Sequence, residues 1–106
     1  MEGRRTGWTF LSNHAHVLIS LAKRSDARIR DLADDVGITE RAVAQILADL
    51  EAAGVLAKER TGRRNTYHIN SDAPLRHRVE SHRTVADILR LAEVPVPSVR
   101  HLKRVK

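Results

Sequence analysis

Apolar residues recur at helical spacing in the first half of the chain, and these stretches predict three helices. Between residues 10 and 23 they recur at every third or fourth position in two adjacent stripes, which is typical of a helix covered on more than one side. Thr9 is the expected N-cap of this helix. A short helix is predicted over residues 30–36, after a very short strand at Ile29, and a further helix over residues 39–53.

The second half of the chain changes from helical spacing to extended segments and back. Residues 55–60 and 65–70 favour strands, and the turn between them contains Gly62, so they predict a β-hairpin with a basic tip. A final helix is predicted over residues 74–92, and two prolines then introduce a basic tail over residues 93–106. The expected fold class is mainly α with a small β-hairpin and a C-terminal helix.

Between the second and third predicted helices, the residues favour a sharp turn. Gly37 suits a left-handed C-cap, and the small Ala33 four residues earlier lets the next helix pack closely across the first. Ile38 is expected to fill the corner, and Thr39 is the expected N-cap of the following helix. This pattern is that of a helix-turn-helix, which holds its second helix out as a probe for the DNA major groove.

The stretch LADDVGITERAVAQILADLEAAGVLAKERTGRRNTYHI resembles the winged helix-turn-helix regulators of the MarR type, and more loosely those of the ArsR type. The junction LEAAGVL and the return strand GRRNTYHI are the most specific parts. The resemblance implies a winged helix-turn-helix domain over residues 1–92 that binds double-stranded DNA as a homodimeric transcriptional regulator, with repression the favoured action. The chain is shorter than a typical MarR protein, so its dimer face is expected to differ. It also lacks the cysteines of many ArsR metal sensors.

Position by position, the resemblance implies DNA contacts from the helix over residues 39–53 and from the wing over residues 55–70. These residues are Thr39, Glu40, Arg41, Ala44 and Gln45 on the helix, and Arg60, Arg63 and Arg64 on the wing. The residue chemistry agrees in part, because Arg41 and Gln45 share one helix face and suit guanine and adenine edges. Glu40 can accept a hydrogen bond from cytosine, but its charge also repels phosphate. The alternative is that these side chains are ordinary solvated residues that contact no DNA. The arginines at the glycine turn suit backbone or minor-groove contact, or simply a soluble hairpin tip.

Charge is unevenly distributed along the chain and bears on the kind of partner. The net charge is +6 and the sequence pI is about 10.7, which favours polyanions such as nucleic acid. Residues 58–70 carry four Lys or Arg and one Glu, and residues 95–106 carry four Lys or Arg and no carboxylate. Residues 28–57 instead carry three Arg and six Asp or Glu. A winged helix that binds another protein without binding DNA is therefore the alternative, because fold alone does not fix function.

Several functions are not expected from the composition. There is no cysteine, which excludes disulfides and thiolate metal sites, and the pairs His14/His16 and His77/His82 lack ligand spacing. No metal or cofactor is expected, and no catalytic constellation stands out, so the chain is not expected to be an enzyme. No apolar run approaches the roughly 20 residues of a membrane span, so we expect a soluble cytoplasmic protein. A small-molecule effector is left open.

The first and last predicted helices are the expected interface of a homodimer. A core built with only 3% aromatic residues is lean, so burial against a partner would matter. Both helices carry apolar residues beyond a single stripe, and an uncovered apolar surface is unusual on a soluble monomer. The expected interface residues are Phe10, Val17, Leu21, Val85, Ile88 and Leu89. Trp8 is expected to pack on the core, with a contact to a partner subunit as the alternative.

Overall fold

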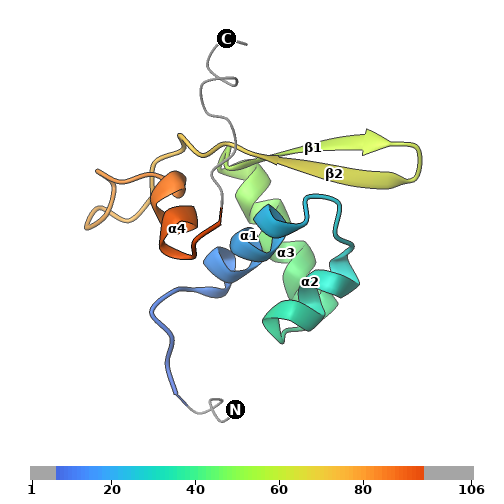
Figure 1. The fold of residues 1–106 in the computed structure, drawn as a ribbon, viewed down its shortest axis with the longest axis horizontal. Coiled ribbons are helices and arrows are strands. Elements are labelled where there is room, and N and C mark those ends of the chain that lie inside the picture. The colour runs from blue at the N-terminus through green and yellow to red at the C-terminus, as the bar shows by residue number, and fades with distance from the viewer. Residues whose placement is uncertain (1–6, 95–106) are drawn as a thin grey trace.

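The computed structural model describes residues 7–94, which form four helices and one antiparallel hairpin. In chain order these are α1 (Asn13–Lys23), α2 (Ile29–Val36), α3 (Glu40–Ala52), β1 (Leu56–Thr61), β2 (Arg64–Ile69) and α4 (Val85–Leu91). α1 lies at the centre, with α2 and α3 on one side and α4 on the other, and the hairpin extends away from the helices (Figure 1). The mainly-α fold with one small hairpin is therefore confirmed. The predicted basic tail, apart from its first two residues, lies outside the described residues.

α1 forms the centre of the hydrophobic core because its apolar residues are covered within the same chain. Val17 and Leu21 are fully buried, and they belong to one cluster with fully buried side chains of α2, α3 and α4. These side chains are Leu32, Val43 and Leu89. Each buried aliphatic side chain of this size contributes about 1.5–3 kcal/mol to folding. The core is almost wholly aliphatic, and Tyr67 of β2 is the one buried aromatic residue in the described part of the chain.

The turn between α2 and α3 forms as predicted. Gly37 caps α2 in the left-handed conformation with φ 82°, and its N–H donates to the Ala33 carbonyl oxygen at 2.8 Å. The Ile38 N–H donates to the same oxygen at 3.1 Å. Thr39 is the N-cap of α3, and its hydroxyl oxygen accepts the Ala42 N–H at 3.0 Å. Because only Ile38 separates the two capping residues, the backbone between α2 and α3 has little conformational freedom. α3 is therefore held in one orientation relative to α2.

α1 begins three residues later than predicted. Its N-cap is Ser12 and not Thr9, and the Ser12 hydroxyl oxygen accepts the Ala15 N–H at 3.3 Å. The Thr9 hydroxyl instead donates to the Leu11 carbonyl oxygen at 2.6 Å, which favours a local turn over a helix start. Both residues are good cap formers, so local chemistry alone did not distinguish them. Residues 7–12 consequently form an irregular, non-helical segment that precedes α1.

Ile29 is the first residue of α2, so the prediction of a short strand there is wrong. The Asp31 carboxylate accepts the Arg28 N–H at 3.1 Å and so satisfies one of the unpaired donors at the start of the helix. The segment just before α2 does reach the hairpin, through a different residue. The Tyr67 N–H on the outer edge of β2 donates to the Ser25 carbonyl oxygen at 3.2 Å. The α1–α2 connection therefore closes that edge of the wing at one point.

The helix predicted over residues 74–92 is wrong for most of its length, because only its last part, α4, is helical. The preceding residues fold back on themselves, and Pro74 forms an isolated antiparallel bridge with Thr84. The physical reason lies in residues 76–83, where Val79 is the only apolar residue and 71% of its surface is exposed. A helix over this stretch would have no apolar face to bury, and tertiary packing supplies most helical stability in proteins.

The wing is a two-stranded hairpin whose buried side chains all lie at its base. Its register runs from Leu56 opposite Ile69 at the base to Thr61 opposite Arg64 at the tip. Gly62, the first of the two turn residues, has φ 64°, the backbone conformation that a type II′ turn requires at this position. Beyond the base, the residues of β1 are exposed along the rest of the strand. The outer part of the wing is therefore solvated on both faces and available for contact.

Candidate nucleic-acid interface

The exposed side of α3 contains the residues that the sequence suggests for base contact. The helix turns its apolar stripe inward, with Val43, Ile46, Leu47 and Leu50 buried. Arg41, Ala44 and Gln45 are exposed, and their helical spacing places them away from that stripe. Glu40 is exposed in the first turn, and the Thr39 hydroxyl is occupied by the cap of α3. The polar side chains that this surface presents beyond the first turn of α3 are thus an arginine and a glutamine one turn apart.

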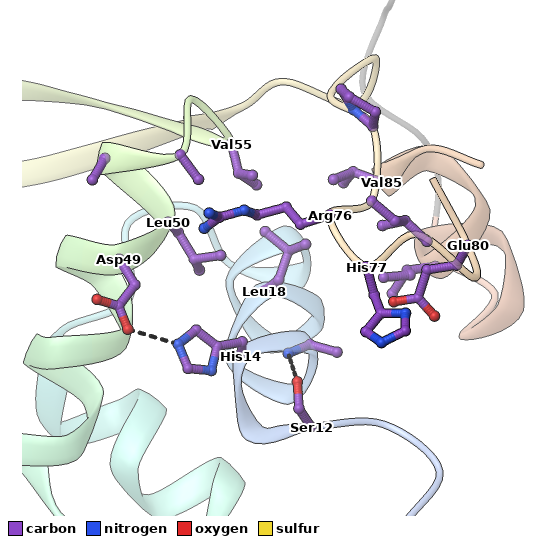
Figure 2. Close-up of a pocket in the computed structure, with 16 residues that line it drawn as sticks. Ser12, His14, Leu18, Asp49, Leu50, Val55, Arg76, His77, Glu80 and Val85 are labelled. Carbon is purple, nitrogen blue, oxygen red and sulfur yellow. Dashed lines mark hydrogen bonds and ion pairs between the residues drawn. The ribbon is translucent and has the colours of Figure 1, made fainter. Parts of the chain in front are cut away.

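Gln45 is held by a carboxylate that the sequence reasoning missed. The Gln45 side-chain amide donates to Asp49 Oδ1 at 3.0 Å, and the other oxygen of Asp49 lies 2.8 Å from His14 Nε2 on α1 (Figure 2). These hydrogen bonds, chiefly that with His14, lower the pKa of Asp49 below 3.8. The spacing of four residues between the glutamine and the aspartate could have indicated their contact. No local signal indicated the histidine, which is 35 positions away.

The three predicted wing arginines occupy different environments. Arg60 Nε donates to the Gly62 carbonyl oxygen at 3.1 Å, across the turn. Arg64 donates to the Asp26 carbonyl oxygen at 2.9 Å and lies 3.5 Å from one oxygen of its carboxylate. Arg63 makes no hydrogen bond or ion pair with any other residue in the described range. Arg64 therefore ties the wing to the α1–α2 connection, whereas Arg63 is the cation that extends from the tip.

The acidic residues of α2 are in part neutralised within the chain. Asp31 forms an ion pair with Arg24 at 3.0 Å, and the hydrogen bond from the Arg28 N–H is the main cause of its lowered pKa. Asp35 accepts a hydrogen bond from the Ser20 hydroxyl at 2.7 Å. Of the acidic residues of α2, Asp34 alone is exposed and has no hydrogen-bond or ion-pair partner among the residues described. The carboxylates of Asp31 and Asp35 thus help to hold α2 against α1.

Most of the residues predicted for a dimer interface lie in the core of one chain. Val17, Leu21, Val85 and Leu89 are buried, and Ile88 is partly buried. The reason is that α2 and α3 cover one stripe of α1 while α4 covers the other, so both stripes are satisfied inside the monomer. Phe10, the remaining residue predicted for this interface, is exposed over 91% of its surface. Trp8 is exposed over 77% of its surface, so the expectation that it packs on the core is wrong. The packing argument for a dimer therefore holds only for the segment before α1.

Several histidines in the described residues have partners suited to structural roles. His68 Nε2 lies 2.7 Å from a Glu59 oxygen across the hairpin, and His77 Nδ1 accepts the Val79 N–H at 3.1 Å. Across residues 7–94, no three or more His, Cys, Asp or Glu side chains are grouped so that they could hold a metal ion. Within the same range, no helix is long and apolar enough to cross a membrane.

An open cavity of about 400 Å³ lies between α1, the C-terminal end of α3, the segment 74–80 and α4 (Figure 2). We call it the α1–α4 cavity. Its apolar lining is Leu18, Leu50, Val55, Leu75, Val85 and Ile88. Polar side chains stand at its edge, and Figure 2 shows Arg76 reaching from the segment 74–80 toward α3. The cavity lies on the α4 side of the molecule, away from the tip of the wing.

Comparison with known proteins identifies the fold. No protein-family model matches the sequence, and no curated protein matches it at a significant level. The PcaV transcriptional regulator of Streptomyces coelicolor, solved with its natural ligand, is 20% identical; the match covers 90% of this chain and 69% of that one, with a TM-score of 0.52. The MarR family protein Rv2887 of Mycobacterium tuberculosis, solved with salicylic acid, is 23% identical; coverage is 90% and 74%, with a TM-score of 0.51.

These matches extend over nearly the whole described chain and not only over the helix-turn-helix. The chain therefore has the winged helix-turn-helix fold of MarR-type regulators, as the resemblance over roughly residues 10–70 implies. Of these two structural neighbours, PcaV is a transcriptional regulator and Rv2887 is a MarR family protein. At this level of sequence identity the likeness establishes the fold, and the residues of this chain must carry the argument for function.

Proposed function

We propose that this protein binds double-stranded DNA in a sequence-specific manner and acts as a transcriptional regulator, with repression the expected action. The observation that carries the proposal is the exposed face of α3, where Arg41 and Gln45 stand one turn apart on a helix fixed by the Gly37 and Thr39 caps. A basic hairpin follows the same helix directly. The regulators among the structural neighbours support the same reading.

In this proposal α3 enters the major groove and the wing contacts the adjacent backbone or minor groove. Arg41 pairs with a guanine edge and Gln45 with an adenine edge, which are the base edges that their donors and acceptors fit. Asp49 holds the Gln45 amide before binding, so the glutamine is positioned in advance. Arg63 adds affinity through phosphate contact without adding sequence information.

Selection from a pool of random-sequence duplexes tests the role of α3. The wild-type chain is expected to enrich one motif, and Arg41→Ala and Gln45→Ala are each expected to relax preference at one base pair. A good base contact is worth about 1–3 kcal/mol of discrimination, or roughly 5- to 150-fold. Arg78→Ala, an exposed arginine in the segment before α4, is the matched control and should leave the motif unchanged. Unchanged preference in both α3 variants would remove this helix as the reader.

A salt titration of the selected duplex tests the wing. Arg63→Ala is expected to weaken binding to all sequences alike and to reduce the slope of log K against log salt by about 0.9, the value for one lost phosphate contact. A slope equal to that of the wild type would remove Arg63 from the contacts. If the wild-type chain binds no duplex even at low salt, the alternative of a protein-binding winged helix replaces this proposal.

A homodimer would extend the proposal, because two copies related by a two-fold axis present two α3 helices to successive major grooves. Such grooves are about 34 Å apart along one face of the duplex. The surface that would form this dimer is not the buried helix faces described above.

A further inference from the structure

His14 lies on α1, outside the helix-turn-helix, yet it contacts the carboxylate that holds Gln45. His14 Nε2 is 2.8 Å from Asp49 Oδ2 (Figure 2). The other oxygen of the same carboxylate, Oδ1, accepts the Gln45 side-chain amide at 3.0 Å. Both contacts lie at the surface, where 47% of the His14 side chain and 44% of the Asp49 side chain are exposed. One carboxylate therefore joins a residue of α1 to a residue proposed for base contact.

The charge of Asp49 decides which atoms face it. Hydrogen bonds from His14 and then from Gln45 lower the pKa of Asp49 below 3.8, and the charge of Arg76 acts in the same direction. Near neutral pH this carboxylate is therefore ionised, and an ionised carboxylate only accepts hydrogen bonds. Both partners must then donate, each through its Nε2 atom. The opposite orientation of the glutamine amide, with Oε1 toward Asp49, would set two acceptors against each other.

The orientation of the Gln45 amide bears directly on base recognition. The terminal torsion of a glutamine is broad and roughly two-fold, so a free side chain adopts both orientations of its amide. When one N–H of Gln45 is donated to Asp49, the second N–H and Oε1 remain available for a base. These are the donor and the acceptor that fit N7 and the N6 amino group of adenine. A flipped amide would present an acceptor to N7 and a donor to the amino group, and both hydrogen bonds would be lost.

We propose that His14 is a positioning residue for base recognition, which acts through Asp49 to hold the Gln45 amide in the orientation that selects adenine. This inference rests on the proposed DNA-binding function and names a further residue that determines its specificity. His14 itself reads no base in this arrangement. Its influence is confined to the one base pair that Gln45 contacts, and a residue of α1 thereby sets part of the specificity of α3.

His14 contributes a hydrogen bond to this arrangement and not the packing of α1 on α3. The two helices are held together by buried side chains of one core cluster, among them Val17 of α1 and Val43 of α3, both fully buried. Removal of the exposed imidazole therefore leaves the two helices in place. It does leave Asp49 with one N–H donor fewer, so the carboxylate can turn away from Gln45 and release the amide.

The side-chain amide of Gln45, the only glutamine of the chain, reports the contact in the absence of DNA. In the NMR spectrum of the full chain labelled at glutamine, its signals should be displaced from those of a free side chain, because one N–H donates to a carboxylate. His14→Ala should move these signals toward the free values. His16→Ala, on the same helix with its own hydrogen bond to Asn13 at 3.1 Å, is the matched control and should leave them unchanged.

Selection from random-sequence duplexes then measures the effect on recognition. The base pair read by Gln45 is the one at which Gln45→Ala relaxes preference. His14→Ala is expected to reduce preference at this base pair about two- to tenfold, the worth of one hydrogen bond, and to leave the other positions unchanged. His14→Gln should restore the preference, because its amide N–H lies as many bonds from the main chain as the imidazole Nε2–H. His16→Ala should leave every position unchanged.

A double variant shows whether His14 acts through the amide. In a chain that already carries Gln45→Ala, His14→Ala should have no further effect on base preference, because the side chain that it positions is absent. Circular dichroism of every variant should match that of the wild type, which separates a change of preference from a loss of fold.

Three results would overturn this inference and leave the proposed function in place. The first is a Gln45 amide whose signals His14→Ala does not move. The second is a wild-type motif whose preference at the Gln45 base pair is the same in His14→Ala. The third is an effect of His14→Ala that persists without the Gln45 side chain or spreads to all positions, because His14 would then act by another route. A wild-type chain that enriches no motif instead removes the proposed function, and this inference with it.

Discussion

Leu89→Ala is expected to destabilise the single chain strongly, because Leu89 is 0% exposed and sits where α4 covers α1. The substitution removes about three methylene equivalents at about 0.8 kcal/mol each, or about 2.4 kcal/mol of transfer free energy. The cavity left behind raises the cost to the range of about 2.7–5 kcal/mol seen when buried leucines are truncated. For a domain of this size each kcal/mol lowers the melting temperature by about 4–8 °C, so a loss of at least about 10 °C is expected.

Leu91→Ala provides the matched control two residues further along the same helix. Leu91 is 69% exposed, and truncation at such a position usually changes the free energy of unfolding by less than about 0.5 kcal/mol. Urea unfolding followed by far-UV circular dichroism, at one fixed protein concentration, measures both variants. Equal effects of the two substitutions would refute the assignment of α4 to the core of the monomer. They would restore the earlier prediction in which Leu89 faces a partner subunit.

Two further predictions concern the backbone and the pH dependence of stability. Gly37→Ala should lower the free energy of unfolding in urea by about 1–2 kcal/mol, because φ is 82° at this position and an L-residue is strained there. Steric crowding is not the cause, because an added methyl group would meet no atom within 4 Å. The hydrogen bond from the Thr84 N–H is the main cause that lowers the pKa of Asp87 in the folded state below 3.8. The contribution of Asp87 to the free energy of unfolding is therefore present above pH 3.8 and is lost as the pH falls through the lower folded-state pKa. The melting temperature should accordingly fall as the pH drops below about 3.8. Asp87→Asn should lower the melting temperature near neutral pH and flatten this acid dependence. An unaltered pH profile would contradict the stabilising role of the hydrogen bond between the Thr84 N–H and the Asp87 carboxylate at the start of α4.

The helix-turn-helix and the wing were predictable from the sequence because their signals are local. Gly37 and Thr39 act through their own backbone and side-chain chemistry, and the strand-favouring segments on either side of Gly62 define a hairpin within a few residues. The length of the last helix was not predictable in the same way. Apolar residues on either side of residues 76–83 continue one helical stripe, although the stretch itself contains a single apolar residue. The bridge between Pro74 and Thr84 shows that the stretch folds back on itself.

The exposed residues of α3 were predictable from helical spacing, whereas the contacts that position them were not. His14 of α1 contacts Asp49 of α3, and Arg64 of β2 contacts Asp26 in the α1–α2 connection. The same limit explains the interface prediction. A sequence shows that α1 carries two apolar stripes, but it does not show whether a second stripe is covered by the same chain or by another. Here α4 covers it, so the predicted interface residues of both helices lie mostly in the core of a single chain.

The two edges of the wing differ in how they resist unwanted association. The outer edge of β2 is closed at one point by Ser25, while β1 has β2 as its only partner strand in the described part of the chain. An open edge of this kind is a template for pairing with strands of other molecules, and that pairing leads to aggregation. The exposed part of β1 carries Lys58, Glu59 and Arg60 in succession, so an added strand would have to desolvate three charges. The wing can therefore project far from the body of the protein without serving as a nucleus for sheet growth.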